Sequence, residues 1–175
     1  MATDQELFQL AKRVGHRLLN SGRRLVTAES CTAGWIAKAV TDVAGSSKWL
    51  ECGYVTYSNL SKMRDLGVAD HTLEKHGAVS DATVREMAAG ALRVSGADVA
   101  VSVSGIAGPD GGTLEKPVGT VWFCVAVRRG EGAELISKVE LFPGDRESVR
   151  RLTVEHALQL ILRLDLPLML RVPAP

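Results

Sequence analysis

The segment Ala97-Asp98-Val99-Ala100-Val101-Ser102-Val103-Ser104 runs directly into the glycine-rich stretch Gly105-Ile106-Ala107-Gly108-Pro109-Asp110-Gly111-Gly112. The first eight residues are mostly apolar and β-branched, which predicts a strand over 97–104 at the centre of a sheet. The glycines that follow allow a loop with close backbone approach. A further strand is expected over 119–127, and Arg129-Gly130-Glu131-Gly132 turns it into another over 134–142.

Helical and strand patterns alternate on both sides of this segment. Apolar residues recur at helical spacing over 4–20, and shorter helices are expected over 32–43 and 61–66. Strands are expected over 24–28 and 52–57. A stronger helix is expected from Ser80-Asp81 to residue 95, and Asp145 caps a final helix over 146–164. This order predicts an α/β fold, namely a three-layer α/β/α sandwich with a mixed, mostly parallel sheet of about five strands.

Length and charge restrict the classes of protein that fit. The 175 residues suit one domain, expected over 1–166, with a frayed C-terminal tail over 167–175. The net charge of +1, from 21 basic and 20 acidic residues, offers no bulk electrostatic attraction to nucleic acid or an anionic membrane. No apolar run approaches the ~20 residues of a membrane span, and the N-terminus does not look like a signal peptide. Three cysteines without paired spacing and four scattered histidines indicate neither disulfides nor a metal site, so a cytoplasmic location is expected.

The segment Thr27-Ala28-Glu29-Ser30-Cys31-Thr32-Ala33-Gly34 is the first candidate site. It places Ser30 between a strand and the start of a helix, where unpaired backbone N–H groups stabilise an oxyanion or lower a nucleophile's pKa. Ala33 and Gly34 let other groups approach closely. Two alternatives stay open at this point. Ser30 or Thr32 caps the helix, and Cys31 is either a rival nucleophile or a small buried hydrophobic residue.

A second polar cluster, Tyr57-Ser58-Asn59, ends the strand over 52–57, and Lys62 lies in the helix that follows. No histidine has a motif-like context, so a serine nucleophile needs another base. A lysine serves if burial lowers its pKa until the neutral amine is populated. The alternative is that Lys62 is a solvated surface lysine, with Tyr57 and Asn59 in ordinary core and turn positions.

The glycine-rich loop after Ser104 matches neither the dinucleotide fingerprint nor the P-loop, because it leads into a strand where both motifs require a helix. Its backbone amides can still surround a ligand, with Gly105 and Gly108 closest to the strand. Near the last helix, Arg146 is a candidate contact for a phosphate group. The alternative is that Asp145 caps the helix, Glu147 complements its dipole and the arginines are solvated.

Five motifs occur together in this order and spacing. They are Thr-Ala-Glu-Ser-Cys-Thr-Ala-Gly (27–34), Gly-Tyr-Val-Thr-Tyr-Ser-Asn (53–59), His-Gly-Ala-Val-Ser (76–80), Val-Ser-Gly-Ile-Ala-Gly-Pro-Asp-Gly-Gly (103–112) and Lys-Pro-Val-Gly-Thr-Val-Trp (116–122). With these motifs the chain closely resembles the CinA C-terminal domain family in its stand-alone PncC form, the nicotinamide mononucleotide amidohydrolases. The resemblance extends from the first expected helix to the last.

The resemblance implies a CinA-like fold and hydrolysis of the carboxamide of nicotinamide mononucleotide. The products are ammonia and nicotinic acid mononucleotide, the reaction belongs to pyridine nucleotide salvage, and no metal or organic cofactor is implied. It also implies that Ser30 and Lys62 act together as the catalytic pair. The residues expected to bind substrate are Thr32, Gly34, Tyr57, Asn59, Ser104, Gly105, Gly108 and Arg146.

A mechanism follows from this assignment as a hypothesis. Neutral Lys62 takes the proton of Ser30, whose oxygen attacks the amide carbon, while backbone N–H groups of 31–34 or 105–108 stabilise the oxyanion. Lys62 then protonates the departing ammonia, and water hydrolyses the acyl-enzyme.

Other functions stay open. One is a hydrolase of another nucleotide amide or pyrophosphate, for which Glu29, Asp110 and Glu115 would be the metal-binding carboxylates. Another is a non-enzymatic module linked to DNA uptake or repair, against which the near-neutral charge argues. A homo-oligomer such as a dimer is also expected, because Leu158, Ile161, Leu162 and the apolar stretch 166–170 form an oligomer surface unless they cover the core.

Overall fold

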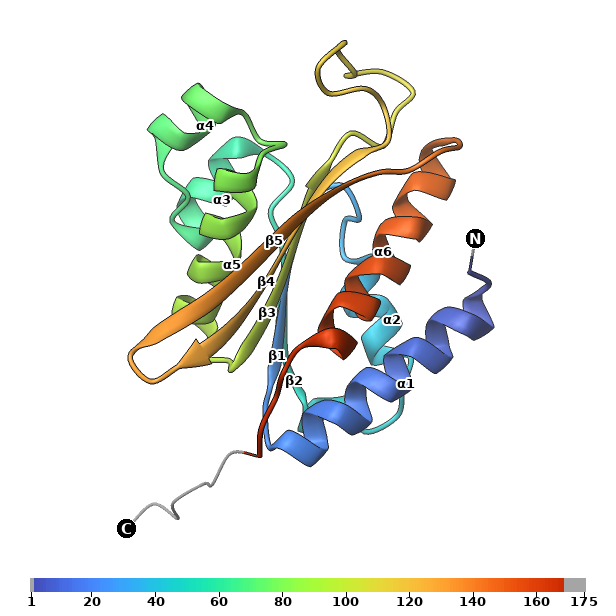
Figure 1. Ribbon diagram of the computed structural model, residues 1–175, viewed down its shortest axis with the longest axis vertical. Coiled ribbons are helices and arrows are strands. Elements are labelled where there is room, and N and C mark those ends of the chain that lie inside the picture. The colour runs from blue at the N-terminus through green and yellow to red at the C-terminus, as the bar shows by residue number, and fades with distance from the viewer. Residues whose placement is uncertain (1, 169–175) are drawn as a thin grey trace.

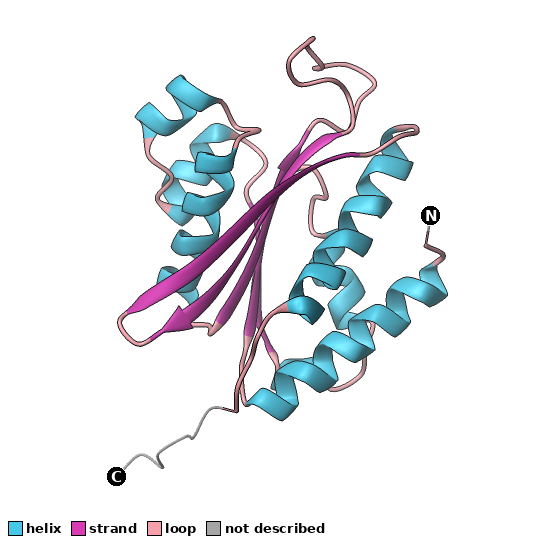
Figure 2. Ribbon diagram, viewed as in Figure 1, coloured by secondary structure: helices cyan, strands magenta, loops and turns pink. Residues whose placement is uncertain are grey.

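A computed structural model describes residues 2–168 and shows a five-stranded sheet between two layers of helices (Figures 1 and 2). The strand order is β2-β1-β3-β4-β5, and the ladders β1–β2 and β1–β3 are parallel while β3–β4 and β4–β5 are antiparallel. Four strands therefore run in one direction and β4 opposes them, which confirms the predicted mixed three-layer fold. The strands are β1 (Leu25–Glu29), β2 (Leu50–Val55), β3 (Val99–Gly105), β4 (Thr120–Arg129) and β5 (Gly132–Leu141).

Helices cover both faces of the sheet (Figure 1). On one face lie α1 (Asp4–Ser21), α2 (Trp35–Thr41) and α6 (Arg146–Arg163), and on the other lie α3 (Asn59–Leu66), α4 (Asp70–His76) and α5 (Asp81–Ser95). A 3-10 helix, Ser46–Lys48, precedes β2. The prediction that α2 begins at residue 32 is wrong, because Ala33 (φ 51) and Gly34 (φ 90) have a left-handed backbone that an α-helix does not contain. The short helix α4 was not predicted.

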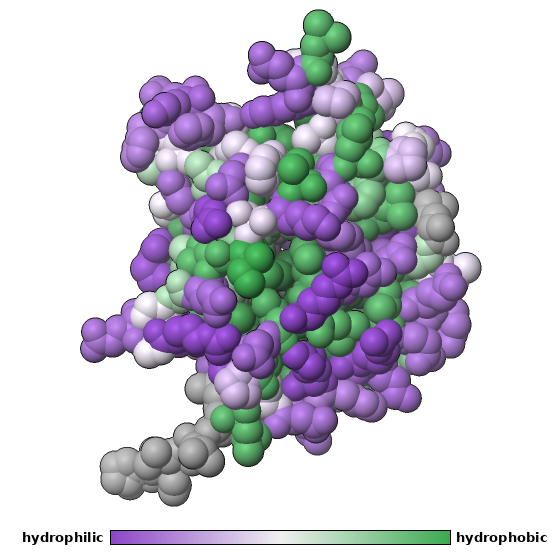
Figure 3. Space-filling view, in the orientation of Figure 1, coloured by the Kyte–Doolittle hydropathy of each residue, from purple (hydrophilic) through white to green (hydrophobic). Residues whose placement is uncertain are grey.

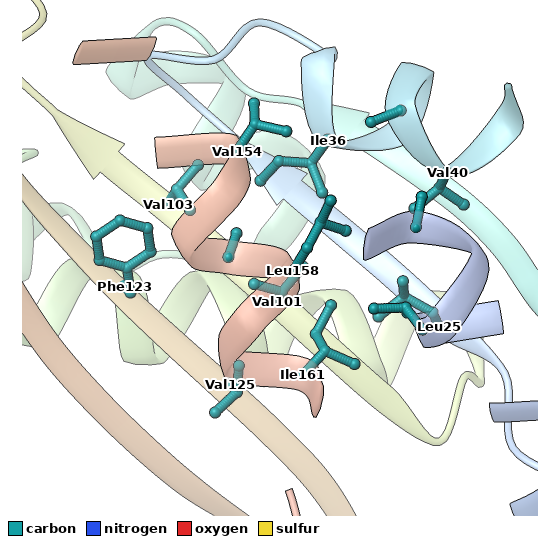
Figure 4. Packing of buried hydrophobic residues seen from close by; sticks show 14 of the residues in the cluster. Leu25, Ile36, Val40, Val101, Val103, Phe123, Val125, Val154, Leu158 and Ile161 are labelled. Atoms are coloured by element: carbon teal, nitrogen blue, oxygen red, sulfur yellow. The ribbon is translucent and has the colours of Figure 1, made fainter. Parts of the chain in front are cut away.

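The main core lies between the sheet and the layer formed by α1, α2 and α6. Figure 4 shows Val101 and Val103 of β3 packed against Leu158 and Ile161 of α6, and the whole strand from 99 to 104 is buried, as its sequence predicted. Leu158 and Ile161 are fully buried, so they cover the core and do not form an oligomer surface. Leu162 is half-buried, and residues 169–175 of the predicted frayed tail lie outside the described residues.

On the opposite face, α5 packs closely against α3 because α5 carries a glycine at the contact. A Cβ atom at Gly90 would lie 1.9 Å from the backbone oxygen of Leu66, the last residue of α3. Any side chain at this position would push the two helices apart. Since Lys62 lies one turn before Leu66 on α3, this contact fixes where the lysine enters the protein.

The edge strand β5 carries exposed apolar side chains. On β5, Ile136, Val139 and Leu141 are exposed, and Figure 3 shows apolar residues gathered over the middle of the face along which β5 runs. Among residues 2–168, no helix has the length and apolar character needed to cross a membrane.

The parallel direction of β1, β2 and β3 brings the segments that follow them to one edge of the sheet. In open α/β sheets, ligands bind in the crevice outside the carboxyl ends of such strands. The segments are 30–34 after β1, 56–58 after β2 and 106–119 after β3, and α6 begins at the same end (Figure 1).

Candidate active site

Lys62 is completely buried at this edge of the sheet, with an exposed fraction of 0%. It projects from the first turn of α3, whose N-terminus is capped by Ser58. Its Nζ atom donates hydrogen bonds to the carbonyl oxygens of Thr56 (2.7 Å) and Tyr57 (3.2 Å). The third neighbour of Nζ is the Oγ atom of Ser30 at 3.0 Å. The alternative of a solvated surface lysine is therefore wrong.

Burial lowers the pKa of Lys62 from 10.5 to about 8, and the nearby Cys31 acts weakly in the opposite direction. None of the ion pairs among residues 2–168 involves this lysine. The neutral amine is therefore within reach near neutral pH. A neutral amine has two N–H donors and one lone pair, and the two carbonyl oxygens can only accept. In that state both donors are occupied, and the lone pair is left to face the hydroxyl of Ser30.

Ser30 follows β1 directly and is 8% exposed. Its own N–H group donates to the Val103 oxygen (3.1 Å) and is not available to an oxyanion. Ser30 lies between β1 and α2 as predicted, but the expectation that it is near the helix N-terminus is wrong, because α2 begins only at Trp35. The capping alternative is also wrong, since Gly34 is the N-cap and neither the Ser30 nor the Thr32 side chain accepts a hydrogen bond from the first N–H groups of α2.

A buried carboxylate takes the place of that cap. Glu29 accepts hydrogen bonds from the N–H groups of Ile36 (2.9 Å) and Ala37 (2.8 Å) at the start of α2. It also accepts from the hydroxyls of Thr27 (3.1 Å) and Thr32 (2.7 Å). The carboxylate thus fastens the segment after Ser30 between β1 and α2. This role of Glu29 was not predicted from the sequence, in which the position of an acidic residue between a strand and a helix was the available signal.

The four hydrogen bonds also leave Glu29 poorly suited to bind a metal with Asp110 and Glu115. No group of three or more potential metal ligands comes together within residues 2–168.

The residues after Ser30 form a tight turn. The Ser30 carbonyl accepts a hydrogen bond from the N–H of Ala33 (3.1 Å), which places Cys31 and Thr32 at the centre of a β-turn. Within residues 2–168, neither the N–H of Cys31 nor that of Thr32 donates to an oxygen atom. These two groups are candidate donors to an oxyanion formed at Ser30.

A cavity of about 230 Å³ opens over Ser30. Arg146, the first residue of α6, reaches its mouth and donates to the Gly108 oxygen (2.8 Å) and the Tyr57 hydroxyl (3.2 Å). Ala78 and Val79, in the loop before α5, line the cavity although the sequence analysis gave them no role. Their motif, His-Gly-Ala-Val-Ser, was the available signal. The complete lining is Ser30, Cys31, Tyr57, Lys62, Ala78, Val79, Ser104, Gly105, Ala107 and Arg146.

Four of the predicted substrate-binding residues do not line this cavity. Thr32 is fully buried, and its side-chain hydroxyl donates to Glu29. Gly34 lines a separate cavity beside Trp35, Asn59 is exposed at the start of α3, and Gly108 contributes the carbonyl that holds Arg146. The structure brings together the other members of the predicted site, namely Ser30, Tyr57, Lys62, Ser104, Gly105 and Arg146.

Cys31 lines the cavity but is 5% exposed. Burial raises the pKa of its thiol to about 12. Because the thiolate is the reactive form, this favours the alternative in which Cys31 is a small buried hydrophobic residue.

These features define an α/β sandwich with a buried Ser–Lys pair at the carboxyl edge of its parallel strands. The chain belongs to the CinA C-terminal domain family, whose model matches residues 7–164.

Relatives cover almost the whole chain. Over 157 residues it is 58% identical to the nicotinamide-nucleotide amidohydrolase PncC of Escherichia coli (strain K12), covering 90% of this chain and 93% of that protein. It is 52% identical over 155 residues to the nicotinamide-nucleotide amidohydrolase PncC of Pseudomonas putida, covering 89% and 94%. The crystal structure of the competence/damage inducible protein CihA from Agrobacterium tumefaciens has a TM-score of 0.85 and 41% identity, covering 93% of this chain and 96% of that one.

Proposed function

We propose that this chain is a nicotinamide-nucleotide amidohydrolase that converts nicotinamide mononucleotide to nicotinic acid mononucleotide and ammonia in pyridine nucleotide salvage. The names and identities of the PncC relatives support the substrate. The observation that carries the chemistry is the buried Lys62 amine, held by two backbone carbonyls with its third side against Ser30. This arrangement gives the serine a base without a histidine.

In the proposed reaction, the lone pair of neutral Lys62 takes the proton of Ser30 as the serine oxygen attacks the carboxamide carbon. The N–H groups of Cys31 and Thr32 stabilise the resulting oxyanion. The lysine then returns the proton to the leaving nitrogen, which departs as ammonia. A water molecule, deprotonated by the same amine, hydrolyses the acyl-enzyme to release the carboxylate product.

The lining of the cavity suits a flat ring with an anionic group at one end. Ala78, Val79 and Ala107 supply apolar surface for the pyridine ring, beside Ser30 and Lys62. The cationic Arg146 lies at the exposed mouth, where we place the substrate phosphate. Ser104 is almost fully buried, and its hydroxyl has no hydrogen-bond partner among residues 2–168, so it is available to the substrate.

The test is ammonia release from nicotinamide mononucleotide by the wild type, Ser30→Ala and Lys62→Met, with the exposed Ser47→Ala as the control. We expect both site variants to lose at least about 1000-fold in kcat and the control to match the wild type. Near wild-type activity of Ser30→Ala contradicts the whole mechanism. Near wild-type activity of Lys62→Met contradicts only the assignment of Lys62 as the base. A wild type that is inactive with this substrate contradicts the proposed function.

A second comparison tests the phosphate. Nicotinamide riboside lacks that group, so we expect a much higher KM for it in the wild type and a smaller difference between the two substrates in Arg146→Ala. If the wild type and Arg146→Ala prefer nicotinamide mononucleotide over nicotinamide riboside to the same extent, Arg146 does not bind the phosphate. Hydrolysis of a different nucleotide in place of nicotinamide mononucleotide would favour the alternative of another nucleotide hydrolase. Salt-dependent DNA binding without hydrolysis would favour the alternative of a non-enzymatic module.

Two further expectations accompany the proposal. A cytoplasmic location fits the three free cysteines Cys31, Cys52 and Cys124. A homo-oligomer stays a prediction, and sedimentation at several protein concentrations tests it. The exposed apolar residues of β5 are a more suitable surface for it than the buried residues of α6.

A further inference from the structure

We propose that Arg150 is a positioning residue that holds the turn after Ser30 so that the N–H groups of Cys31 and Thr32 face the oxyanion. The inference rests on the proposed function, because it assumes Ser30 as the nucleophile. Arg150 does not line the cavity over Ser30, and its own contacts are with the backbone of the turn and with Trp35.

The guanidinium of Arg150 binds two successive carbonyl groups. Its Nε atom donates to the Cys31 oxygen (3.1 Å) and its Nη2 atom to the Thr32 oxygen (3.0 Å). The half-buried group also lies over the Trp35 ring, 5.4 Å from the ring centroid. The expectation from sequence that the arginines at the start of α6 are solvated is therefore wrong for Arg150. A planar fork of donors fits two neighbouring carbonyls better than a single ammonium group does.

The orientation of these carbonyls determines the orientation of the candidate N–H donors. In a trans peptide unit, the C=O and N–H bonds point in opposite directions. The Cys31 oxygen is held toward Arg150, so the N–H of Thr32 points away from α6. The Ser30 oxygen is held inside the turn by the N–H of Ala33, so the N–H of Cys31 points out of the turn.

The peptide between Cys31 and Thr32 is the one whose rotation distinguishes the two common types of β-turn. Rotation of this peptide would place a carbonyl oxygen where the N–H of Thr32 now lies, and that oxygen would repel an oxyanion. Within residues 2–168, the Cys31 oxygen accepts a hydrogen bond from Arg150 alone. The β-branched Thr32 disfavours the rotated turn by itself, so we expect loss of Arg150 to reduce the rate without abolishing it.

The neighbouring arginine provides a matched control. Arg151 also contacts Trp35, at 4.9 Å from the ring centroid. Its donors bind Asp4, Glu147 and the Ala2 oxygen, and none of them reaches the turn. Replacing Arg151 therefore removes a similar side chain from the same surface but leaves the carbonyls of Cys31 and Thr32 bound.

The experiment compares kcat and KM for the wild type, Arg150→Ala, Arg150→Lys and Arg151→Ala, after thermal unfolding has shown that each is folded. We expect Arg150→Ala to lose about 10- to 100-fold in kcat with KM changed less than about threefold, because the interaction acts in the transition state. Arg150→Lys should recover little of the loss, added guanidinium ion should restore part of it in Arg150→Ala, and Arg151→Ala should behave like the wild type. A wild-type kcat in Arg150→Ala, or an equal loss in Arg151→Ala, overturns the proposal.

A measurement independent of catalysis separates this inference from the proposed function. We expect amide hydrogen exchange at Ala33, whose N–H closes the turn by donating to the Ser30 oxygen, to be faster in Arg150→Ala than in the wild type and unchanged in Arg151→Ala. Unchanged exchange in Arg150→Ala overturns the positioning role even if the enzyme acts on nicotinamide mononucleotide. If Ser30→Ala keeps its activity, the proposed mechanism fails. Faster exchange in Arg150→Ala would then show only that Arg150 orders the turn, and the role of Arg150 in catalysis would be overturned as well.

Discussion

The Nζ atom of Lys62 lies 3.0 Å from the Oγ atom of Ser30, although 32 positions separate the two residues and they follow different parallel strands. Ser30 comes directly after β1, and Lys62 lies on the helix that follows β2. Because β1 and β2 are parallel neighbours, their carboxyl ends meet and bring the two side chains together. Burial then removes water from the amine and lowers its pKa, which the proposed role of Lys62 as a base requires.

The activity should rise with pH. Since the pKa of Lys62 is lowered to about 8, the inactive ammonium form dominates below that pH and the neutral amine above it. We expect kcat/KM for ammonia release to increase from about pH 6, to reach half of its maximum near pH 8 and to level off above about pH 9. A profile that is flat or falls with pH over this range would contradict the role of the amine. Lys62→Arg, which stays protonated throughout, should be inactive at every pH.

The same lysine should make stability depend on pH. Its pKa is about 8 in the folded protein and near the ordinary 10.5 when unfolded. Between these values the unfolded chain binds more protons, so the free energy of unfolding should increase with pH across this window. Below the window both states are protonated and the full cost of burial is present.

Lys62→Met lacks this group and serves as the reference. Urea unfolding of both proteins at about pH 7.5 and about pH 10 measures the effect. The stability of the wild type relative to the variant should be greater at the higher pH. An unchanged difference would mean that Lys62 keeps its ordinary pKa in the folded protein.

Cys31 should be dispensable for the chemistry. Its thiol is buried and burial raises its pKa to about 12, so we expect it to stay unmodified by iodoacetamide near neutral pH. Cys31→Ser should keep kcat within about tenfold of the wild type, the loss arising from a small change in packing beside Ser30. The half-exposed Cys52 gives the matched control, because Cys52→Ala removes the most accessible thiol of the three. If iodoacetamide inactivates the wild type and Cys52→Ala but not Cys31→Ser, Cys31 is again a candidate nucleophile.

Loss of the Glu29 charge should loosen the segment that carries Ser30. Glu29→Gln places an NH₂ group against donors that now bind a carboxylate oxygen, namely the N–H groups of Ile36 and Ala37 or the Thr hydroxyls. We expect a loss of about 1–3 kcal/mol in the free energy of unfolding, together with a lower kcat. Thr32→Val removes one donor and leaves the carboxylate in place, so its loss should be smaller. Urea unfolding of the two variants decides this, and equal stability of Glu29→Gln and the wild type would contradict it.

Local pattern predicted most of the elements of the fold. The buried strand at 97–104, the long amphipathic helix at the N-terminus and the final helix capped by Asp145 were all found close to their predicted bounds. These elements follow from period and capping, which depend on residues near one another in the chain. The start of α2 was misplaced, since its position depends on the distant geometry of Glu29 and the left-handed Ala33, and α4 has only seven residues with little periodicity.

For the site, sequence alone determined the residue types and the order of the motifs, and the family resemblance that the five motifs carry was what paired Ser30 with Lys62. Only the tertiary structure decided that Lys62 is fully buried, that its donors are taken by two carbonyls and that Arg150 holds the turn beside Ser30. Burial and hydrogen-bond partners depend on which strands become neighbours. A pKa or a backbone orientation is therefore a property of the folded chain, and the pKa of Lys62 is lowered only because β1, β2 and α3 meet around its amine.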